Sequence, residues 1–336
     1  MNRRTSLNRR TFLGMSAGAA AMGLAGTRPG FAQQFPSHTM NVVIPTGEGG
    51  GVDRAARAFT SVWQKHLGAN FEFGYFPGAS GQVGYEVYVG KREPDAHNLL
   101  FGNIGPEMIV YATQDTSYTY PDDYIYFAGI DVDDSAIWVA ANSELQTIED
   151  LVEAGKQRTI NISTSRLPHP SSLGVLALGE ATGADFRLIP YGGGSAARTA
   201  AITGEVEACA TFLGSSLGLD DQIRFLTVFQ NRNRLPNLTN DAPPVNEALG
   251  TQIPALSGTR AWAIHRAAAE EYPDRFEKLK ETSRAAFEDP AYRQEVEQSK
   301  LIWEFAEYSD EEACAAEARA TMELAERYKD VLSGNG

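Results

Sequence analysis

The sequence predicts an α/β fold in which helices cover mainly parallel sheets. Three observations lead to this class. Short apolar strand patterns alternate with amphipathic helix patterns from residue 39 to residue 230, and such alternation is typical of βαβ units. A strand, a glycine-rich loop and a helix follow one another at 42–57 and again at 186–203. Small polar residues follow several strands, at the carboxyl ends where open α/β sheets bind ligands.

Each element is assigned from its apolar period and from the Gly, Pro, Ser or Asp residues that bound it. The expected strands are short apolar runs, at 40–44, 71–75, 99–101, 126–130, 137–141, 159–162, 186–190, 206–212, 225–229 and 261–265. The expected helices carry an apolar face that recurs every three to four residues, at 53–67, 83–91, 147–154, 171–182 and 195–203. Residues 231–258 show no period, whereas 267–332 is helical in pattern and heavily charged.

The most informative stretch is 41–57, which reads NVVIPTGEGGGVDRAAR. A strand stops at Pro45, a glycine-rich loop follows, and a helix opens at Asp53. Glycines let a ligand approach the main chain, and a helix N-terminus presents unpaired N–H groups at the positive end of its dipole. The stretch therefore predicts an anion site. Asp53 itself would repel an anion, so we expect it to cap its helix and tie down the loop.

Residues 1–32 have the features of an export signal. Several arginines precede a moderately apolar run at 13–25, and RRTFL at 9–13 resembles a twin-arginine motif. The apolar run is too short and too rich in Gly and Ala to span a membrane. We therefore expect 1–32 to be a signal peptide that sends the folded protein to the periplasm by the twin-arginine pathway.

The charge balance limits the possible partners. The chain has 29 basic and 43 acidic residues, and 1–32 holds five of the arginines and no acid, so the remainder carries a formal charge of −19. This charge disfavours nucleic acid and anionic membranes as partners. Cys209 and Cys314 lie in apolar or helical surroundings, which favours buried thiols and leaves a disulfide open. The histidines are scattered without a metal-binding spacing, so neither a metal nor a cofactor is expected.

The 41–57 stretch is similar to the motif P-x-x-P-G-G-G-x-D-x-x-A-R of the Bug family, the substrate-binding proteins of tripartite tricarboxylate transporters. Further segments resemble the family in the same order, namely PGASGQVG at 77–84, LFGN at 100–103, the polar loop at 159–174, IPYGGGSAA at 189–197 and TGEVE at 203–207. The ordered set covers nearly the whole chain after residue 32.

The resemblance implies a two-lobed periplasmic-binding-protein fold of type II, the venus-flytrap arrangement, with a mainly parallel sheet in each lobe. Lobe one would hold 33–134 and 232–336, lobe two would hold 135–231, and two crossover strands would form the hinge. The protein would be a monomeric receptor rather than an enzyme. It would capture a small organic anion (a mono-, di- or tricarboxylate, an aromatic acid or an amino acid) and deliver it to the membrane permease subunits of the transporter.

The resemblance also assigns binding residues, one position at a time. Lobe one would contribute Thr46, Gly47, Gly49, Gly50, Gly51, Ser80 and Asn103. Lobe two would contribute Ser163, Ser165, Ser171, Ser172, Tyr191 and Gly192. Two of these have an alternative role, since Ser171 stands where an N-cap belongs and Tyr191 could be a packed wall residue. The surface that docks the permease is left open, with acidic residues of the tail helices as candidates.

Four residues depart from the family pattern and are candidates for specificity. Glu48 replaces a proline of the first loop and could receive a ligand amine. Arg166 and His169 interrupt a loop that relatives build from Gly, Ser and Asn, and either could pair with a second carboxylate. Thr211 stands where many relatives have an acid. The alternative for Glu48, Arg166 and His169 is that they point to solvent.

Two enzyme interpretations remain as alternatives. GEGGGV at 47–52 is close to the dinucleotide motif GxGxxG, with Glu72 as ribose acceptor, although Val52 replaces the third glycine. GSSLG at 214–218 matches GxSxG, with Ser216 as nucleophile and His265 downstream in triad order, although no oxyanion segment precedes it. The chain would then be an exported serine hydrolase or a dinucleotide-binding oxidoreductase.

Overall fold

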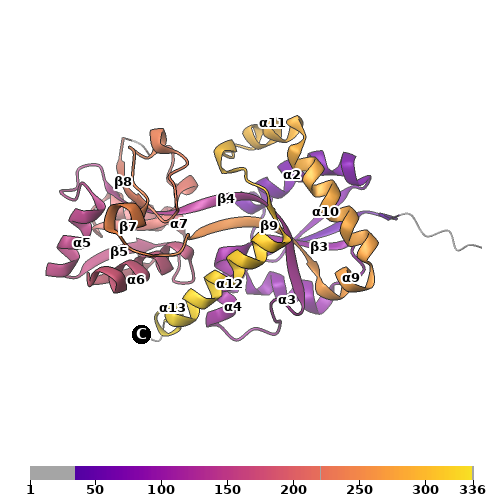
Figure 1. The fold of residues 1–336 in the computed structure, drawn as a ribbon, viewed down its shortest axis with the longest axis horizontal. Helices are drawn as coiled ribbons and strands as arrows, with labels where there is room; N and C mark the ends of the chain where they lie inside the picture. Colours follow the sequence, from indigo (N-terminus) through magenta and orange to yellow (C-terminus); the bar gives the residue numbers. More distant parts are fainter. Residues whose placement is uncertain (1–34, 220, 335–336) are drawn as a thin grey trace, which may run out of the picture. The chain divides into compact units, whose positions relative to one another are not determined.

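The computed structural model describes residues 35–219 and 221–334 (Figure 1). The strands are β1 (Met40–Ile44), β2 (Phe71–Tyr75), β3 (Asn98–Asn103), β4 (Tyr124–Ala140), β5 (Ile160–Thr164), β6 (Phe186–Pro190), β7 (Ala208–Phe212), β8 (Ile223–Val228), β9 (Ser257–His265) and β10 (Ser309–Asp310). The α-helices are α2 (Gly51–Leu67), α3 (Gln82–Lys91), α4 (Ile104–Thr113), α5 (Ile148–Gln157), α6 (Pro170–Thr182), α7 (Gly194–Ile202), α8 (Val245–Leu249), α9 (Arg266–Glu271), α10 (Pro273–Glu288), α11 (Pro290–Gln298), α12 (Glu311–Arg327) and α13 (Lys329–Leu332). Short 3-10 turns are η1 (Ala79–Gly81), η2 (Leu213–Ser215), η3 (Pro236–Leu238) and η4 (Trp303–Phe305).

The strands form one sheet whose order is β2-β1-β3-β9-β4-β7-β5-β6, with β8 and β10 also paired to β4. Pairing is parallel among β1, β2 and β3 and among β5, β6 and β7, whereas β4 and β9 run antiparallel to their neighbours. The predicted α/β class is confirmed. The carboxyl ends of β1 and β3 open into the loops at 45–50 and at the start of α4, where a ligand site is expected.

A single long strand, β4, belongs to both parts of the sheet (Figure 1). Residues 124–134 pair with β9, whereas 135–140 pair with β7 and β8. At the change of partner, Ser135 donates its N–H to the carbonyl of Leu256 and accepts from the N–H of Phe229. The prediction of two separate strands at 126–130 and 137–141 was wrong, since the acidic residues between them are strand residues too.

Helix α4 has no counterpart among the predicted elements. Residues 104–110 of this helix are all buried. A helix that is covered on every side carries no amphipathic period, so its sequence resembles an apolar run rather than a helix. Its missing period explains why it was not predicted.

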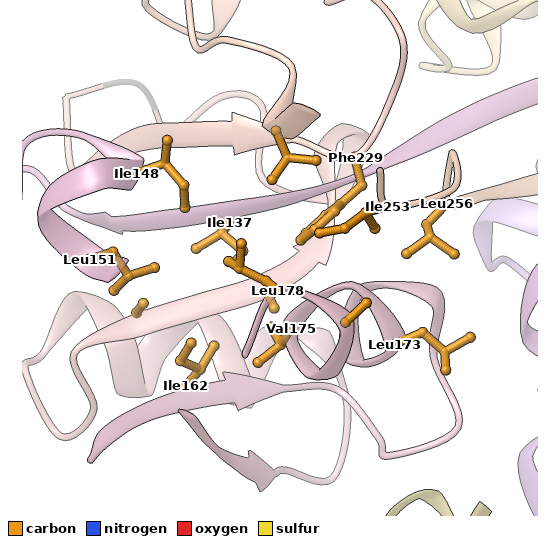
Figure 2. Close-up of a cluster of buried hydrophobic side chains, with 14 of the residues drawn as sticks. Ile137, Ile148, Leu151, Ile162, Leu173, Val175, Leu178, Phe229, Ile253 and Leu256 are labelled. Carbon is orange, nitrogen blue, oxygen red and sulfur yellow. The ribbon is translucent and has the colours of Figure 1, made fainter. Parts of the chain in front are cut away.

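The apolar core is divided into several clusters. Figure 2 shows one of them, in which Leu151 of α5 and Leu178 of α6 lie near Ile137 of β4. Elsewhere, the predicted apolar face of α2 is buried; its Trp63 contacts Trp262 of β9 edge to face, and its Phe59 contacts the same ring at a tilt. Burying a large apolar side chain contributes about 1.5–3 kcal/mol, so these faces fix the positions of the helices.

The charged tail is helical, as predicted, and α12 lies beside α4 (Figure 1). Its Leu324 and Ala325 share a core cluster with Leu173 and Leu178 of α6. The tail therefore packs against elements from both parts of the sheet. None of the helices in the described ranges has the length and apolarity that a bilayer span requires.

Candidate functional site

The glycine-rich loop is held in place by Asp53. The Asp53 carboxylate, 2% exposed, accepts from the Gly49 N–H at 2.7 Å and from the Tyr75 hydroxyl at 2.7 Å, and pairs with Arg57 at 2.8 Å. Burial alone would raise the pKa of Asp53, but the bonds from Gly49 and Tyr75 and the Arg57 charge lower it. Asp53 ties down the loop, as expected. The prediction that Asp53 caps its helix was wrong, because the helix begins earlier, with Gly50 as its N-cap and no side-chain capping bond.

Beside the start of α2 lies a cavity of about 250 Å³. Its polar lining comes from Arg54 of α2, from Asp131 and Asp133 of β4 and from Arg260 of β9, and its apolar wall from α11 and η4. Of the predicted binding residues, Gly51 alone lines this cavity. The sequence analysis did not name Arg260 as a candidate site residue. The one signal that could have identified it is a lone arginine beside an apolar strand pattern.

Arg260 is a buried cation between two carboxylates. Its guanidinium pairs with Asp131, and its Nη2 lies 3.9 Å from Asp133 Oδ2. Asp133 in turn accepts from the N–H of Gly214 at 2.9 Å. Burial raises the pKa of Asp133 to about 7, against the opposing charge of Arg260. Within the described ranges, Arg260 Nε is buried without a hydrogen-bond partner.

A second polar cluster lies where the loops after β2 and β5 meet the first turn of α4. Arg166 donates from Nη1 to the carbonyl oxygen of Ser80 at 2.8 Å. Burial lowers the pKa of Arg166, whereas Glu107 of α4 raises it. Glu107 is 3% exposed, and burial raises its pKa to about 8 despite the Arg166 charge. Arg166 therefore faces the interior of the protein beside a carboxyl group, rather than solvent.

The N-termini of α4 and α6 come together at this cluster. A Cβ built on Gly105, in the first turn of α4, would lie 2.8 Å from Cγ of Pro170, the first residue of α6. Asn103 is the N-cap of α4 and makes no capping bond with its side chain. Because both dipoles have their positive ends here, the arrangement suits an anion.

Three of the predicted residues keep hydrogen-bonding capacity at buried atoms. Thr46 Oγ1, Asn103 Oδ1 and Ser171 Oγ have no hydrogen-bond partner among the described residues. Buried polar groups are normally satisfied, so such groups point to water or to a ligand. Thr46 and Asn103 follow the neighbouring parallel strands β1 and β3, and Ser171 lies beside Pro170 at the start of α6.

His169, rather than Ser171, is the N-cap of α6, so the alternative role of Ser171 was wrong. The Nδ1 atom of His169 accepts from the N–H of Ser171 at 3.1 Å, and the ring lies 4.2 Å from that of Phe212. Burial, with a smaller contribution from Arg166, lowers the pKa of His169 to about 3. A neutral, buried ring offers no positive charge to a second carboxylate.

The side chains of three other predicted residues already have hydrogen-bond partners within their own part of the fold. Ser163 donates to the Ala197 carbonyl at 2.8 Å, and the Ser172 hydroxyl bonds with Thr164 at 2.9 Å and with the Arg166 carbonyl at 3.1 Å. Tyr191 donates to Glu205 at 2.9 Å. These side chains hold the loops in place.

The remaining predicted residues are more exposed to solvent. Glu48 is exposed and pairs with Arg57 at 3.3 Å, and Ser165 is half-buried. Gly47, Gly49, Gly50 and Gly192 are exposed, so their main chain is accessible.

The two enzyme motifs lack the geometry that they need. Ser216 is buried and its hydroxyl accepts from Trp138 Nε1 at 3.1 Å and bonds with Thr211 at 3.2 Å. His265 stacks on Tyr88 at 4.0 Å and its Nε2 lies 3.1 Å from the Tyr88 carbonyl oxygen. Nucleophile and base thus have separate partners. In the dinucleotide-like loop the Val52 side chain is buried where the fingerprint needs a glycine.

The cysteines are both free and buried, which confirms the favoured interpretation. Burial raises the pKa of Cys209 to about 11 and that of Cys314 to about 12. Neither thiol has the lowered pKa of a reactive cysteine, so neither is a candidate nucleophile.

Solved structures share this fold. A TctC solute-binding protein from Polaromonas, solved without ligand, is 22% identical, with a TM-score of 0.73 over 87% of this chain and 98% of that one. A protein of Rhodopseudomonas palustris with adipate is 19% identical, with a TM-score of 0.71 over 89% and 98% of the two chains. MatC of the same organism, with bound malate, is 19% identical, with a TM-score of 0.65 over 89% and 100%. These likenesses establish the two-lobed periplasmic-binding-protein fold.

The family follows from the sequence itself. Residues 56–315 match the family model TctC, described as the tripartite tricarboxylate transporter family receptor. The match covers most of the chain, including β2, β3, the loops around Arg166 and all of β4 and β9. The resemblance to the Bug family is therefore confirmed, and the chain belongs to the tripartite tricarboxylate transporter family of receptors.

Proposed function

We propose that this receptor captures a small dicarboxylate between its two lobes and hands it to the membrane subunits of a tripartite tricarboxylate transporter. The proposal is supported by the family and by two structural neighbours, which hold malate and adipate. Malate and adipate are both dicarboxylates, of different length, so the class of ligand is better supported than its size.

One observation carries the proposal, namely the buried polar atoms of Thr46, Asn103 and Ser171 that find no hydrogen-bond partner within 35–219 and 221–334. Hydroxyl groups donate to a carboxylate, and the side-chain amide of Asn103 does so when its oxygen and nitrogen are exchanged, an assignment that coordinates alone do not fix. The exposed main chain of the glycine-rich loop and the N-termini of α2, α4 and α6 would add further donors.

The expected affinity is about micromolar. A hydrogen bond to a charged group contributes about 1.5–3 kcal/mol. Five or six such bonds, set against an association cost of about 4 kcal/mol or more, leave about −8 kcal/mol. Such affinity suits a protein that must release its ligand to a permease.

The lobes are proposed to be 33–134 with 232–336 and 135–231, and to close as rigid bodies. This division is supported by β4, which changes partner between residues 134 and 135, and by the return of the chain beside Ser135 at Phe229 and Leu256. Closure would be driven by ligand contacts to both lobes.

Export through the twin-arginine pathway is part of the proposal, although residues 1–32 lie outside the described residues. Replacing Arg9 and Arg10 by lysine should keep the protein in the cytoplasm, as cell fractionation would detect. The receptor is proposed to act as a monomer without cofactor, nucleic acid or catalysis. Its permease would dock on acidic residues of the tail helices, whose neutralisation should abolish uptake and leave ligand affinity unchanged.

Calorimetric titration with malate, succinate, adipate, a monocarboxylate and a tricarboxylate tests the proposal. A dicarboxylate should bind one to one, and Thr46→Val and Ser171→Ala should each weaken that binding about tenfold, the worth of about 1.4 kcal/mol. The matched control is Ser61→Ala, because the Ser61 hydroxyl donates to the Ala58 carbonyl of its own helix and, among the described residues, has no other partner. The proposal fails if no carboxylate binds, or if Ser171→Ala binds as tightly as the control.

A further inference from the structure

Two histidines and an aspartate lie together at the amino ends of β1 and β3, at the end of the strands opposite the proposed ligand site. His38 precedes β1, and Asp95 and His97 precede β3. The two strands are parallel neighbours, and the Asn41 N–H donates to the His97 carbonyl at 2.8 Å. Their amino ends therefore lie side by side, although the sequence separates the histidines widely. The ligand site is expected at the carboxyl ends of the same strands.

The potential ligand atoms of these three side chains all lie within 4.8 Å of one another. His97 Nδ1 is 3.6 Å from Asp95 Oδ2, which is too long for a good hydrogen bond. Two ligands of a tetrahedral zinc ion, each bonded at about 2.0–2.1 Å, are about 3.3 Å apart. The His97–Asp95 pair is therefore close to the spacing of two ligands that share one ion.

One oxygen of the Asp95 carboxylate accepts hydrogen bonds from its own loop, and the other oxygen faces the His97 ring. Asp95 Oδ1 accepts from the His97 N–H at 2.9 Å and from Asn98 Nδ2 at 3.1 Å. Oδ2 is the atom that faces the His97 ring. Hydrogen bonds that orient a ligating carboxylate are typical of metal sites, since they fix the ligand before the ion arrives.

The two histidine rings differ in exposure. His97 is 3% exposed, so its surroundings fix the position of its ring. His38 is exposed, and its ring stacks on that of His97 with the centroids 3.8 Å apart. An exposed side chain changes rotamer readily, so His38 can turn a ring nitrogen toward an ion held by Asp95 and His97.

One positive group stands against the site. Arg275 of α10 donates to the Asp95 carbonyl oxygen at 2.8 Å, and its charge also lowers the pKa of His97. The chain as a whole has a formal charge of −14, which favours cations. Two nitrogen ligands and one carboxylate form a ligand set that suits borderline divalent ions.

We propose that His38, Asp95 and His97 form a binding site for a divalent transition metal of the zinc class, with water as the fourth ligand. The site lies on lobe one, away from the proposed carboxylate site. It would fasten the first residues before β1 to the loop before β3. This inference does not rest on the proposed function, and either can fail alone.

The test is titration of zinc into the purified protein, prepared without a polyhistidine tag and freed of metal by a chelator. One ion should bind per chain. His38→Gln and Asp95→Asn should each weaken binding at least about tenfold, and Asp95→Asn keeps an oxygen that can accept the two loop bonds. Titration of cobalt should give the visible absorption of a tetrahedral complex in the wild type, and not in His38→Gln or Asp95→Asn.

The matched control is His66→Gln. His66 of α2 lies 2.9 Å from Asp289, so it is a second surface histidine beside a carboxylate, but the part of the chain that the structure describes adds no third ligand there. Zinc affinity should not change in this variant. The inference is overturned if the wild type binds no zinc, if His38→Gln binds it equally well, or if His66→Gln abolishes binding. Dicarboxylate titration of the same variants should give wild-type affinity throughout.

Discussion

Arg166 donates a hydrogen bond at 2.8 Å to the carbonyl oxygen of Ser80, which joins the loop after β5 to the turn before α3. Arg166 follows β5 and Ser80 follows β2, so the two residues belong to different parts of the sheet. The donor is a half-buried charged group, and hydrogen bonds of charged groups contribute about 1.5–3 kcal/mol. It therefore holds the two parts together.

Replacing Arg166 should weaken ligand binding, because closure would lose this bond. We expect Arg166→Met to lower dicarboxylate affinity roughly 10- to 100-fold, as measured by calorimetry. The matched control is Arg158→Met, since Arg158 is an exposed arginine that pairs with Glu207 away from the cluster. Equal affinities in the two variants would mean that the Arg166–Ser80 bond does not favour the closed form.

Glu107 should make the protein less stable as the pH rises. Burial raises its pKa from 4.5 to about 8, with Arg166 opposing the shift. Between these values the folded state holds a proton that the unfolded state has released, so the free energy of unfolding falls as the pH increases. Glu107→Gln cannot ionise, and we expect its urea midpoint to fall less than that of the wild type between about pH 5 and about pH 8.

Part of the pH dependence should persist in Glu107→Gln. Burial also raises the pKa of Asp133 and of Glu317 to about 7, and both carboxyl groups remain in the variant. Glu153→Gln, on the exposed face of α5, is the control and should follow the wild-type curve. Parallel curves for the wild type and Glu107→Gln would contradict a raised pKa at Glu107.

Gly105 should be needed for close contact between α4 and α6. A Cβ at this position would overlap the Ser257 carbonyl oxygen and approach Pro170. We expect Gly105→Ala to cost about 1–3 kcal/mol of stability by overpacking. With saturating dicarboxylate, its radius of gyration by X-ray scattering should stay that of the ligand-free protein.

The control for Gly105 is Gly90→Ala in α3, where an added Cβ meets no atom within 4 Å. That variant should gain up to about 1 kcal/mol from helix propensity and should close normally. Compaction of Gly105→Ala to the same radius as Gly90→Ala would refute the role given to this glycine.

Ser216 should be a structural residue. We expect Ser216→Ala to lose about 1 kcal/mol of stability, because its hydroxyl bonds to Trp138 and Thr211. A fluorogenic ester assay should find no hydrolysis by the wild type or by the variant. Hydrolysis by the wild type that disappears in Ser216→Ala would restore the hydrolase interpretation.

Local features of the fold were predictable from the sequence. The order of strand, glycine loop and helix at 41–57 depends on neighbouring residues, and so does the bond by which Asp53 holds the loop, whose partner Gly49 is four residues away. The helix at 171–182 was predicted within one residue of its start at Pro170. Its N-cap was not, because histidine is an unusual cap and a serine stood nearby.

Features that depend on distant partners were not predictable. The aspartates of β4 interrupt its apolar pattern, and they are tolerated in a strand because Arg260 and Arg234 pair with them. The same distant pairing explains why Arg260 was missed. By sequence, Ser163 and Thr211 were candidates for the ligand site. In the fold, the Ser163 hydroxyl donates to a backbone carbonyl and the Thr211 hydroxyl accepts from Trp138.

The continuity of β4 has a mechanical consequence. Both backbone groups of Ser135 are hydrogen bonded, so β4 is held firmly where it changes partner. If the proposed lobes close about this point, β4 must absorb the movement as torsion, which would permit a small and repeatable angle between them. The membrane subunits of the transporter would then recognise occupancy as an orientation of the lobes, and an acid that allows the same twist would be transported.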